Sequence, residues 1–300
     1  GGGNTGIGQA AGLAITTGTN NAAVGHQALK ATTTANDNTA MGVNALLSNT
    51  TGANNTAVGR GALAGNTTAN DNTAVGFYAL DVNTTGASNV AVGRDALGAN
   101  TTAANNTAVG KSALAANTEG TENTAVGLTA LTTLTTGSYN TALGVNAMRL
   151  STTAANNVAV GKSAMDANTT GAANVAVGVA ALDANTTGVN NVAVGYNALT
   201  TNVAGDNTVA IGNEAAEQLN PSGNVDMNGV YIGYQAGDEV TTGRHNTVIG
   251  ALTANALTTG SNNLLLGTTA GNASQPGGSI STGDNQIVLG NTSSQNAHIQ

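Results

Sequence analysis

A glycine recurs at a fixed interval along most of the chain. From Gly8 to Gly212 it stands at every seventeenth position, over twelve consecutive steps. The pattern then continues to Gly290 with steps of 21, 17, 17 and 23 residues. A constant period of this kind is the signature of a repeat architecture, in which each repeat forms one unit that stacks on its neighbours.

The spacing predicts a single repeat domain over residues 1–300 with about 17 coils. The coils are expected to be regular over 1–212 and irregular over 213–300, with enlarged loops at 213–232 and 268–289. Loops that extend from a rigid scaffold are a usual place for binding residues.

Each repeat spells a similar phrase around its glycine, as in "NTAVGRGALAGN" at 55–66. In most repeats Asn stands four residues before the glycine and Val, Ile, Met or Leu one before it, while Ala follows three after and Leu or Met four after. We expect a short strand at "TAVG", a second short strand around "AL" and a polar turn. The Val and the Leu are the expected buried pair of each coil.

A repeat of this length cannot hold two packed helices, and it lacks the 3.6-residue apolar periodicity of a helix. Two short strands and their turns fit one coil of a β-solenoid, whose coils stack at roughly 4.8 Å with equivalent strands pairing in parallel. The predicted fold class is therefore all-β, a parallel β-roll or solenoid.

The composition limits how thick the core of such a coil can be. Charged residues make up 7% of the chain, aromatics 2% and hydrophobic residues 40%, and the chain has one Phe, no Trp and no Cys. The interior must therefore be built from small side chains. Because so lean a coil buries little apolar surface, we expect identical chains to pack side by side as a homo-oligomer.

The repeated phrase itself is interpreted as scaffold and not as a binding site. The glycine allows the backbone to come close to a neighbour where a side chain would clash. The Asn column is expected to form amide ladders or to hold left-handed turn conformations.

At this point the "NTAVG…AL" unit resembles the head repeat of trimeric autotransporter adhesins, the haemagglutinin-type repeat, over essentially the whole chain. The resemblance implies a left-handed parallel β-roll, three chains wound into one homotrimeric rod, and a role in attachment. The coil is longer than is usual in that family, and the "NTTG" turn accounts for the surplus.

Two features favour a phage tail fibre over a bacterial adhesin. The sequence shows no coiled-coil heptads or membrane-anchor strands after the repeats. Its ending, "GDNQIVLGNTSSQNAHIQ" at 283–300, resembles the segment that precedes the self-cleaving chaperone of phage tail fibres, which would put a cleavage point near Gln300.

The expected protein is thus a non-enzymatic structural and adhesive fibre segment of a virion, located outside the cell. Its partners would be two further copies of itself, fibre or tail proteins at its ends, and a glycan or protein of the host surface. The alternative is the head of an adhesin on a bacterial cell surface.

Other classes of function have less support in the sequence. A net charge of −8 without a basic patch argues against nucleic-acid binding, and no apolar run reaches the ~18 residues that cross a bilayer. His26, His245 and His298 fall in different coils and the acidic residues are scattered, so no catalytic, cofactor or metal site is predicted.

The column directly after the glycine holds several basic residues, which are interpreted as a solvated face, with a weak anion-binding stripe as the alternative. Aromatic residues, three of them in the same column, are the weak candidates for receptor binding, and two flank Gly233 beside an enlarged loop. The basic residues are Arg60, Arg94, Lys111 and Lys162, and the aromatic candidates are Phe77, Tyr78, Tyr196, Tyr231 and Tyr234.

An ice-binding solenoid is a further alternative. The "NTT" phrases at 49–51, 66–68, 83–85 and 100–102 would stack into ranks of Thr. The ranks are expected to break at Leu134 and Thr152, and the enlarged loops would spoil a flat face.

Overall fold

The computed structural model describes residues 2–272 and 280–291, and these contain strands and turns but no helix. They form a parallel β-solenoid of about 15 turns with a repeat of about 17 residues, somewhat fewer turns than the repeats counted on the glycines. The predicted all-β solenoid is confirmed. The segment around Gln300, His298 and residues 273–279 of the loop 268–289 lie outside the described residues.

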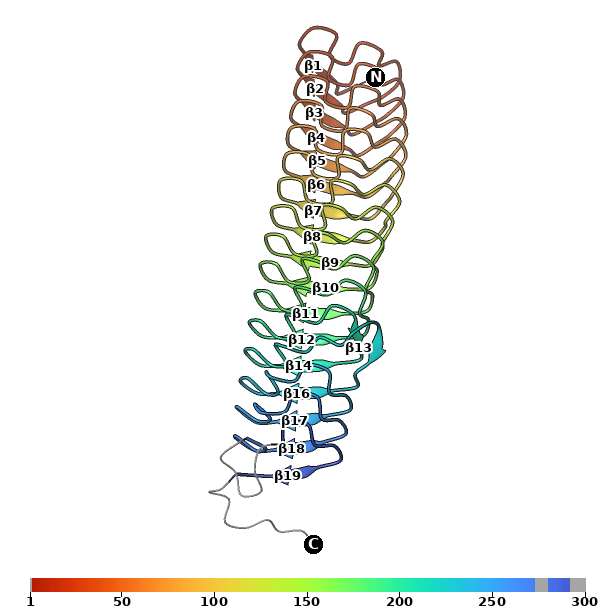
Figure 1. Ribbon diagram of the computed structural model, residues 1–300. Coiled ribbons are helices and arrows are strands. Elements are labelled where there is room, and N and C mark those ends of the chain that lie inside the picture. Colours follow the sequence, from red (N-terminus) through yellow and green to blue (C-terminus); the bar gives the residue numbers. More distant parts are fainter. Residues whose placement is uncertain (1, 273–279, 292–300) are drawn as a thin grey trace. The chain divides into compact units, whose positions relative to one another are not determined.

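The chain falls into two compact units, Gly1–Ala154 (unit 1) and Ala155–Gln300 (unit 2), and each is described by itself. In unit 1, three-residue strands form one parallel sheet, stacked from red to green in Figure 1. Each strand pairs with the next at an offset of 17, so that every residue lies beside its equivalent in the following repeat. The strands are β1 (Thr5–Ile7), β2 (Ala22–Val24), β3 (Thr39–Met41), β4 (Thr56–Val58), β5 (Thr73–Val75), β6 (Val90–Val92), β7 (Thr107–Val109), β8 (Thr124–Val126) and β9 (Thr141–Leu143).

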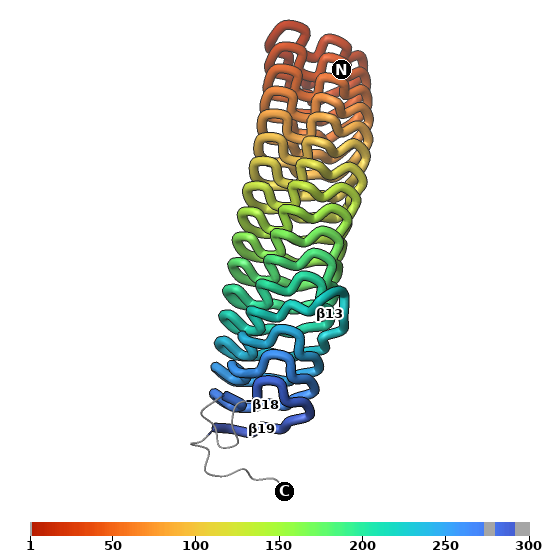
Figure 2. The backbone as a smooth tube through the Cα atoms, in the orientation of Figure 1, coloured from red at the N-terminus to blue at the C-terminus, as the bar shows by residue number. Residues whose placement is uncertain are grey.

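Unit 2 repeats this arrangement with two longer connections. The offset is 21 where Val209 pairs with Val230, and 23 where Leu264 pairs with Ile287. A small parallel pair, β13 with β15, accompanies the first of them, and Figure 2 shows the backbone protruding at β13. The strands are β10 (Val158–Val160), β11 (Val175–Val177), β12 (Val192–Val194), β13 (Gly205–Asp206), β14 (Val209–Ile211), β15 (Val225–Asp226), β16 (Val230–Ile232), β17 (Thr247–Ile249), β18 (Leu264–Leu266) and β19 (Ile287–Leu289).

Each of the three-residue strands from β2 to β12 turns its middle residue inward and its outer two residues outward. In β4, Ala57 is fully buried while Thr56 and Val58 remain partly exposed. The prediction that the Val before the glycine is buried is therefore wrong. Successive strand residues point to opposite faces, and the narrow interior at this point accepts only a methyl group, so Ala faces inward and Val outward.

The segment around "AL" is a series of turns, so the predicted second strand is also wrong. Ala62 and Leu63 are both fully buried although they are consecutive, which an extended strand does not allow because its side chains alternate. The backbone of Leu63 is left-handed, with φ of 51°. This conformation turns both side chains into the core, and the predicted burial of the Leu is confirmed.

The recurrent glycine permits the coils to stack, as predicted. Gly93 has φ of 133°, and a Cβ placed on it would lie 2.5 Å from the carbonyl oxygen of Gly110 in the next coil. Both the conformation and the contact exclude a larger residue.

The Asn column before the strands forms a buried amide ladder, which confirms that interpretation. The Asn89 Oδ1 accepts the backbone N–H of Asn106 at 2.9 Å, and the Asn89 Nδ2 donates to the Ala103 carbonyl at 2.9 Å. The backbone N–H of Asn89 is in turn bound by the Asn72 Oδ1 at 2.9 Å. Each amide thus satisfies buried backbone groups of neighbouring coils.

A second buried Asn column stands in the "NTT" turns and is bound mainly through side chains. The Asn83 Nδ2 donates to the Asn66 Oδ1 at 3.1 Å and to the Gly86 carbonyl at 2.9 Å, and the Asn83 Oδ1 accepts from the Asn100 Nδ2 at 3.0 Å. Leu134 occupies the same column and is fully buried. This column therefore accepts an apolar residue.

We expect Gly93→Ala to lower the free energy of unfolding by about 3 kcal/mol, because the methyl group overlaps the next coil in a backbone conformation that is strained for Ala. Gly98→Ala in the same coil is the control. Gly98 has no left-handed φ, and the nearest atom to its added Cβ is the Asp95 carbonyl oxygen at 3.3 Å, so the cost should stay below about 1 kcal/mol. Urea unfolding followed by circular dichroism measures both, and equal costs would contradict this account of the glycine.

We expect Asn89→Leu to destabilise unit 1 by about 2 kcal/mol, because it leaves the Asn106 N–H buried without a partner, whereas the Ala103 carbonyl keeps the hydrogen bond from Asn100 Nδ2 at 3.0 Å. Asn83→Leu should cost about half as much, since the Asn83 Oδ1 accepts from a side chain and Leu134 already stands in that column. The same unfolding measurement compares the two variants. A larger loss for Asn83→Leu would show that the first ladder is not the main polar support of the coil.

Candidate functional site

The aromatic candidates are divided between the two units of the chain. Phe77 and Tyr78 belong to unit 1, and the other three belong to unit 2. Tyr196 and Tyr234 are each 51% exposed and stand directly after their glycines. Tyr231, by contrast, is fully buried and so is not on the surface.

Tyr231 fills the interior of unit 2 at the position that holds Ala in most coils. It pairs with Ala210 on one side and Val248 on the other, so the inward column widens from this point. A Cβ on Gly237 would overlap the Tyr231 ring, which shows how closely the turn covers it. Burial raises the pKa of the Tyr231 phenol far above its ordinary value. The role of Tyr231 is therefore packing.

Phe77 and Tyr78 form a compact aromatic pair on the surface of unit 1. Their ring centroids are 4.3 Å apart in an edge-on arrangement, and Phe77 is 41% exposed. The guanidinium carbons of Arg60 and Arg94 lie 5.9 Å and 5.7 Å from the centroid of the Phe77 ring. Arg60 and Arg94 come from the coils before and after Phe77. Phe77 therefore interrupts the column of basic residues, but its ring contacts the basic residue on either side.

Carboxylates border this cluster. The Arg94 Nε lies 3.0 Å from the Asp95 Oδ2, an ion pair between exposed groups. Burial, chiefly, and the nearby Asp95 charge raise the pKa of Asp81. The cluster therefore places the two guanidinium groups of Arg60 and Arg94 at an aromatic ring, with the acceptor oxygens of Asp81 and Asp95 beside them.

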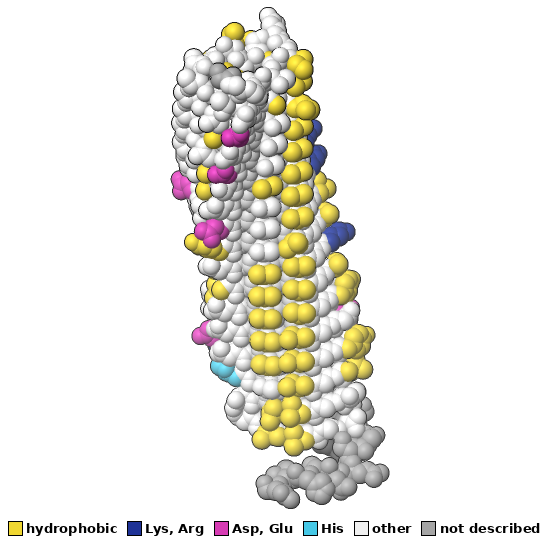
Figure 3. All heavy atoms as spheres, turned by 180° about the vertical axis from the view of Figure 1, so that it is seen from behind, with side chains coloured by type: hydrophobic (Ala, Val, Ile, Leu, Met, Phe, Trp, Pro, Cys, Tyr) yellow, Lys and Arg dark blue, Asp and Glu magenta, His cyan; other side chains and the backbone are white. Residues whose placement is uncertain are grey.

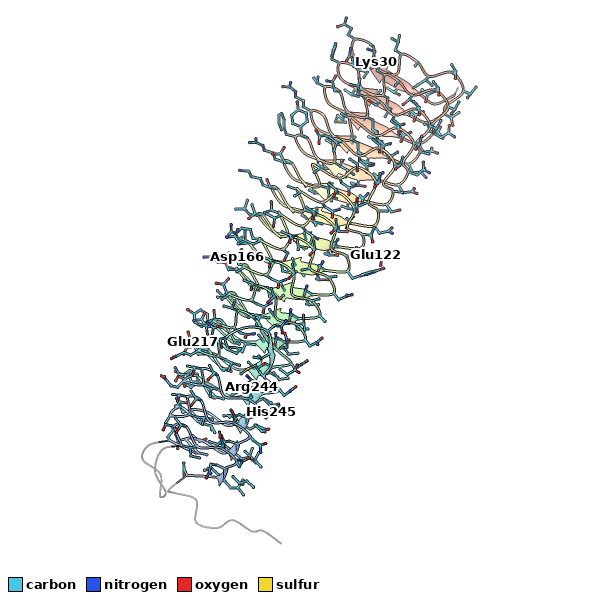
Figure 4. All side chains as sticks on the ribbon, turned by 45° about the vertical axis from the view of Figure 1, so that its right-hand side comes forward. Lys30, Glu122, Asp166, Glu217, Arg244 and His245 are labelled. Carbon is cyan, nitrogen blue, oxygen red and sulfur yellow. The ribbon has the colours of Figure 1, made fainter. Side chains whose placement is uncertain are left out.

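A different, acidic cluster lies beside the enlarged loop of unit 2. The Gln235 Nε2 donates to the Glu214 Oε2 at 2.7 Å, and the Asn197 Nδ2 donates to the Glu217 Oε1 at 3.4 Å. Burial, with the neighbouring Glu239 and Glu217 charges, raises the pKa of Asp238 to about 6. In Figure 4, Asp166 and Glu217 lie on one side of unit 2, and Arg244 and His245 lie on another.

The described part of the chain offers little to a metal ion. Over residues 2–272 and 280–291, no three His, Cys, Asp or Glu side chains are grouped so that they could hold one. His26 lies in unit 1 and His245 in unit 2, in separate coils. Within the same ranges, no helix has the length and apolar character needed to span a bilayer.

The first Thr rank runs on through Thr135 and Thr152, whereas Glu119 occupies the second rank, and the hydroxyls are only partly free. Thr50 donates its hydroxyl to the backbone carbonyl of Thr67 in the next coil, at 2.9 Å, and Thr135 donates to Thr152 in the same way, at 3.0 Å. The expected break of the rank at Thr152 is therefore wrong, because Leu134 interrupts only the Asn column. In the "NTT" phrases at 49–51, 66–68 and 83–85 one of the two Thr hydroxyls is thus already bound within the solenoid, which weakens the ice-binding alternative.

The outward face of the strands is a candidate functional surface that the sequence analysis did not predict. In unit 2, the two outward positions of each strand of the main sheet are apolar, apart from Thr247. Figure 3 shows them as two adjacent yellow columns. We call this surface the apolar face of unit 2: Val158, Val160, Val175, Val177, Val192, Val194, Val209, Ile211, Val230, Ile232, Ile249, Leu264, Leu266, Ile287 and Leu289.

Unit 1 carries a narrower version of this surface. Its strands place Val, Ile, Met or Leu at the last outward position and mostly Thr at the first, as in Thr73 and Val75 of β5. Reading the strand phrase with a period of two would have revealed both faces, because "VAV" places two Val on the side opposite to Ala.

Comparison with known proteins identifies no relative, since neither a protein-family model nor a curated protein matches the chain.

We expect Asp238→Asn to stabilise unit 2 at pH 7.5 and to have little effect at pH 4.5. The folded pKa of about 6 is above the ordinary value of 3.8, so the folded chain binds the proton more tightly, and stability falls as the pH rises through this range. The shift of the urea midpoint between wild type and variant, measured at both pH values, tests this. Glu119→Gln, which removes a carboxylate from unit 1, is the control, and a pH-independent shift for Asp238→Asn would contradict the prediction.

Proposed function

We propose that the chain is a non-enzymatic structural and adhesive segment of a fibre, in which three copies pack side by side along their strand faces. The observation that carries this proposal is the apolar face of unit 2. Val177, Ile211 and Ile249 on this face are 36%, 38% and 40% exposed in the single chain. Side chains of this kind normally face a core or a partner.

The size of the apolar face supports an interface between chains. Its fifteen side chains, each partly exposed, form one contiguous apolar patch, and the largest such patch on a protein, typically about 300–600 Å², is often functional. The face is also regular, because successive strands repeat the same side chains at about 4.8 Å. A second copy of the same chain offers a matching face, whereas an unrelated partner would need the same period.

The interior supports the same conclusion. Each coil buries mainly Ala and one Leu or Met, with amide ladders in place of a thick apolar core. A coil this lean gains stability when its outer face is covered as well. The homotrimer and the left-handed coil remain part of the proposal, and the resemblance to adhesin head repeats supports both.

The biological setting follows from the same resemblance. A phage tail fibre on the virion, with tail proteins at its ends and a host-surface glycan or protein as receptor, is the preferred setting. The head of a bacterial surface adhesin is the alternative. Antibody labelling of virions and of bacterial surfaces, viewed by electron microscopy, distinguishes them.

We expect the wild-type chain to sediment at about three times its monomer mass of 28.9 kDa. The double variant Val177→Glu/Ile211→Glu should sediment as a monomer, because it buries unpaired carboxylates between chains. Sedimentation equilibrium measures both masses.

Val179→Glu is the matched control. Val179 is 45% exposed but stands after the glycine, off the strand face, so this variant should keep the mass of the wild type. A monomeric wild type, or equal dissociation of the control, would overturn the proposed assembly.

A further inference from the structure

A single row of side chains from four successive coils crosses the surface of unit 1. It consists of Arg60, Phe77, Arg94 and Lys111, each directly after its repeat glycine, and we call it the basic row. All of its members are exposed. Figure 3 shows dark blue Lys and Arg side chains at one edge of the view, and Lys30, labelled in Figure 4, stands five residues after its glycine and so in a different column.

The backbone holds the basic row in register. The carbonyl oxygens of Arg60, Phe77 and Arg94 each accept an N–H from the next coil, at 3.0, 3.0 and 2.9 Å. The starting points of the side chains are therefore fixed at the coil spacing, with the two Arg residues about 9.6 Å apart at twice ~4.8 Å. Only the side-chain ends remain to be ordered.

Phe77 orders those ends. The guanidinium groups of Arg60 and Arg94 lie within 6 Å of its ring centroid, one from each neighbouring coil. An Arg beside an aromatic ring loses rotamer freedom while its remaining N–H groups stay available for a carboxylate or a sulfate. In Arg94 the Nε already donates to the Asp95 Oδ2, so its two terminal NH₂ groups are the donors that face a ligand. The row thus presents pre-ordered donors, which reduces the entropy cost of binding an anion.

We propose that the basic row binds an extended acidic oligosaccharide through its carboxylate or sulfate groups. This inference rests on the proposed adhesive function and gives that function a receptor class. The guanidinium groups of Arg60 and Arg94 take acidic groups on the chain of sugars, and the Lys111 ammonium takes the next one along.

The arrangement favours a sparsely charged glycan over a nucleic acid. Three cations in a line are fewer than the six to ten phosphate contacts that make strong binding to nucleic acid. The faces of the Phe77 ring are approached by the two Arg residues, which leaves little room for a base to stack. Asp95 lies beside Arg94 and repels closely spaced phosphates, while its carboxylate can accept hydrogen bonds from sugar hydroxyls.

Isothermal titration calorimetry of the full chain tests the proposal with two probes, a hexamer of galacturonic acid for carboxylates and a heparin-derived hexasaccharide for sulfates. We expect at least one probe to bind, more weakly as salt is raised, and a neutral maltohexaose not to bind. The double variant Arg60→Gln/Arg94→Gln should lower the affinity at least ten-fold. Phe77→Leu should lower it about three-fold, because the donors remain but lose their order.

Lys162→Gln is the control, since Lys162 also stands directly after its repeat glycine but lies in unit 2, where the equivalent residue of the next repeat is Val179 and not an aromatic residue. It should change the affinity less than two-fold. Circular dichroism and the sedimented mass of each variant report folding and assembly separately. Absence of binding to both probes, equal loss with Lys162→Gln, or tighter binding of a single-stranded oligonucleotide would overturn this inference. The proposed fibre assembly is tested separately, by the sedimented mass.

Discussion

The structure depends on the hydrogen bonds that join each coil to the next in register. Because equivalent residues are 17 apart and lie side by side, any side chain that suits one coil must also suit its own copy above and below. This condition explains the choice of residues. Glycine stands where backbones meet closely, Asn where an amide can bind its own copy, and Ala where the interior is narrowest.

The period and the parallel pairing could be predicted from the sequence, since they follow from the spacing of the repeats. The roles of Gly and Asn could also be predicted, since they follow from the chemistry of these two residues. The direction of the strand residues was predicted wrongly. Hydrophobicity favours Val58 inside over Ala57, but the volume of the coil decides, and volume is not visible in a single repeat. The turns around Leu63 were not predicted, because Leu rarely adopts a left-handed backbone conformation in proteins.

The candidate sites were predicted only in part. Phe77 was identified from its residue type. Its contact with Arg60 and Arg94 could also have been predicted, because these residues lie 17 positions before and after it and therefore occupy the same place in the neighbouring coils. Tyr231, two residues before Gly233, looked equivalent to Tyr234, which directly follows that glycine, yet alternation along the strand puts Tyr231 inside. In a solenoid, the column of a residue and its side of the strand say more than its type.

The equal offset of 17 between strands has a consequence for the gene. A duplication or loss of one whole repeat keeps the reading frame, and it also keeps every ladder, because the new neighbours present the same residues to each other. Copying errors between such similar stretches of DNA can therefore lengthen or shorten the protein without unfolding it. The length of the solenoid can therefore vary in steps of one repeat, independently of what its surface binds.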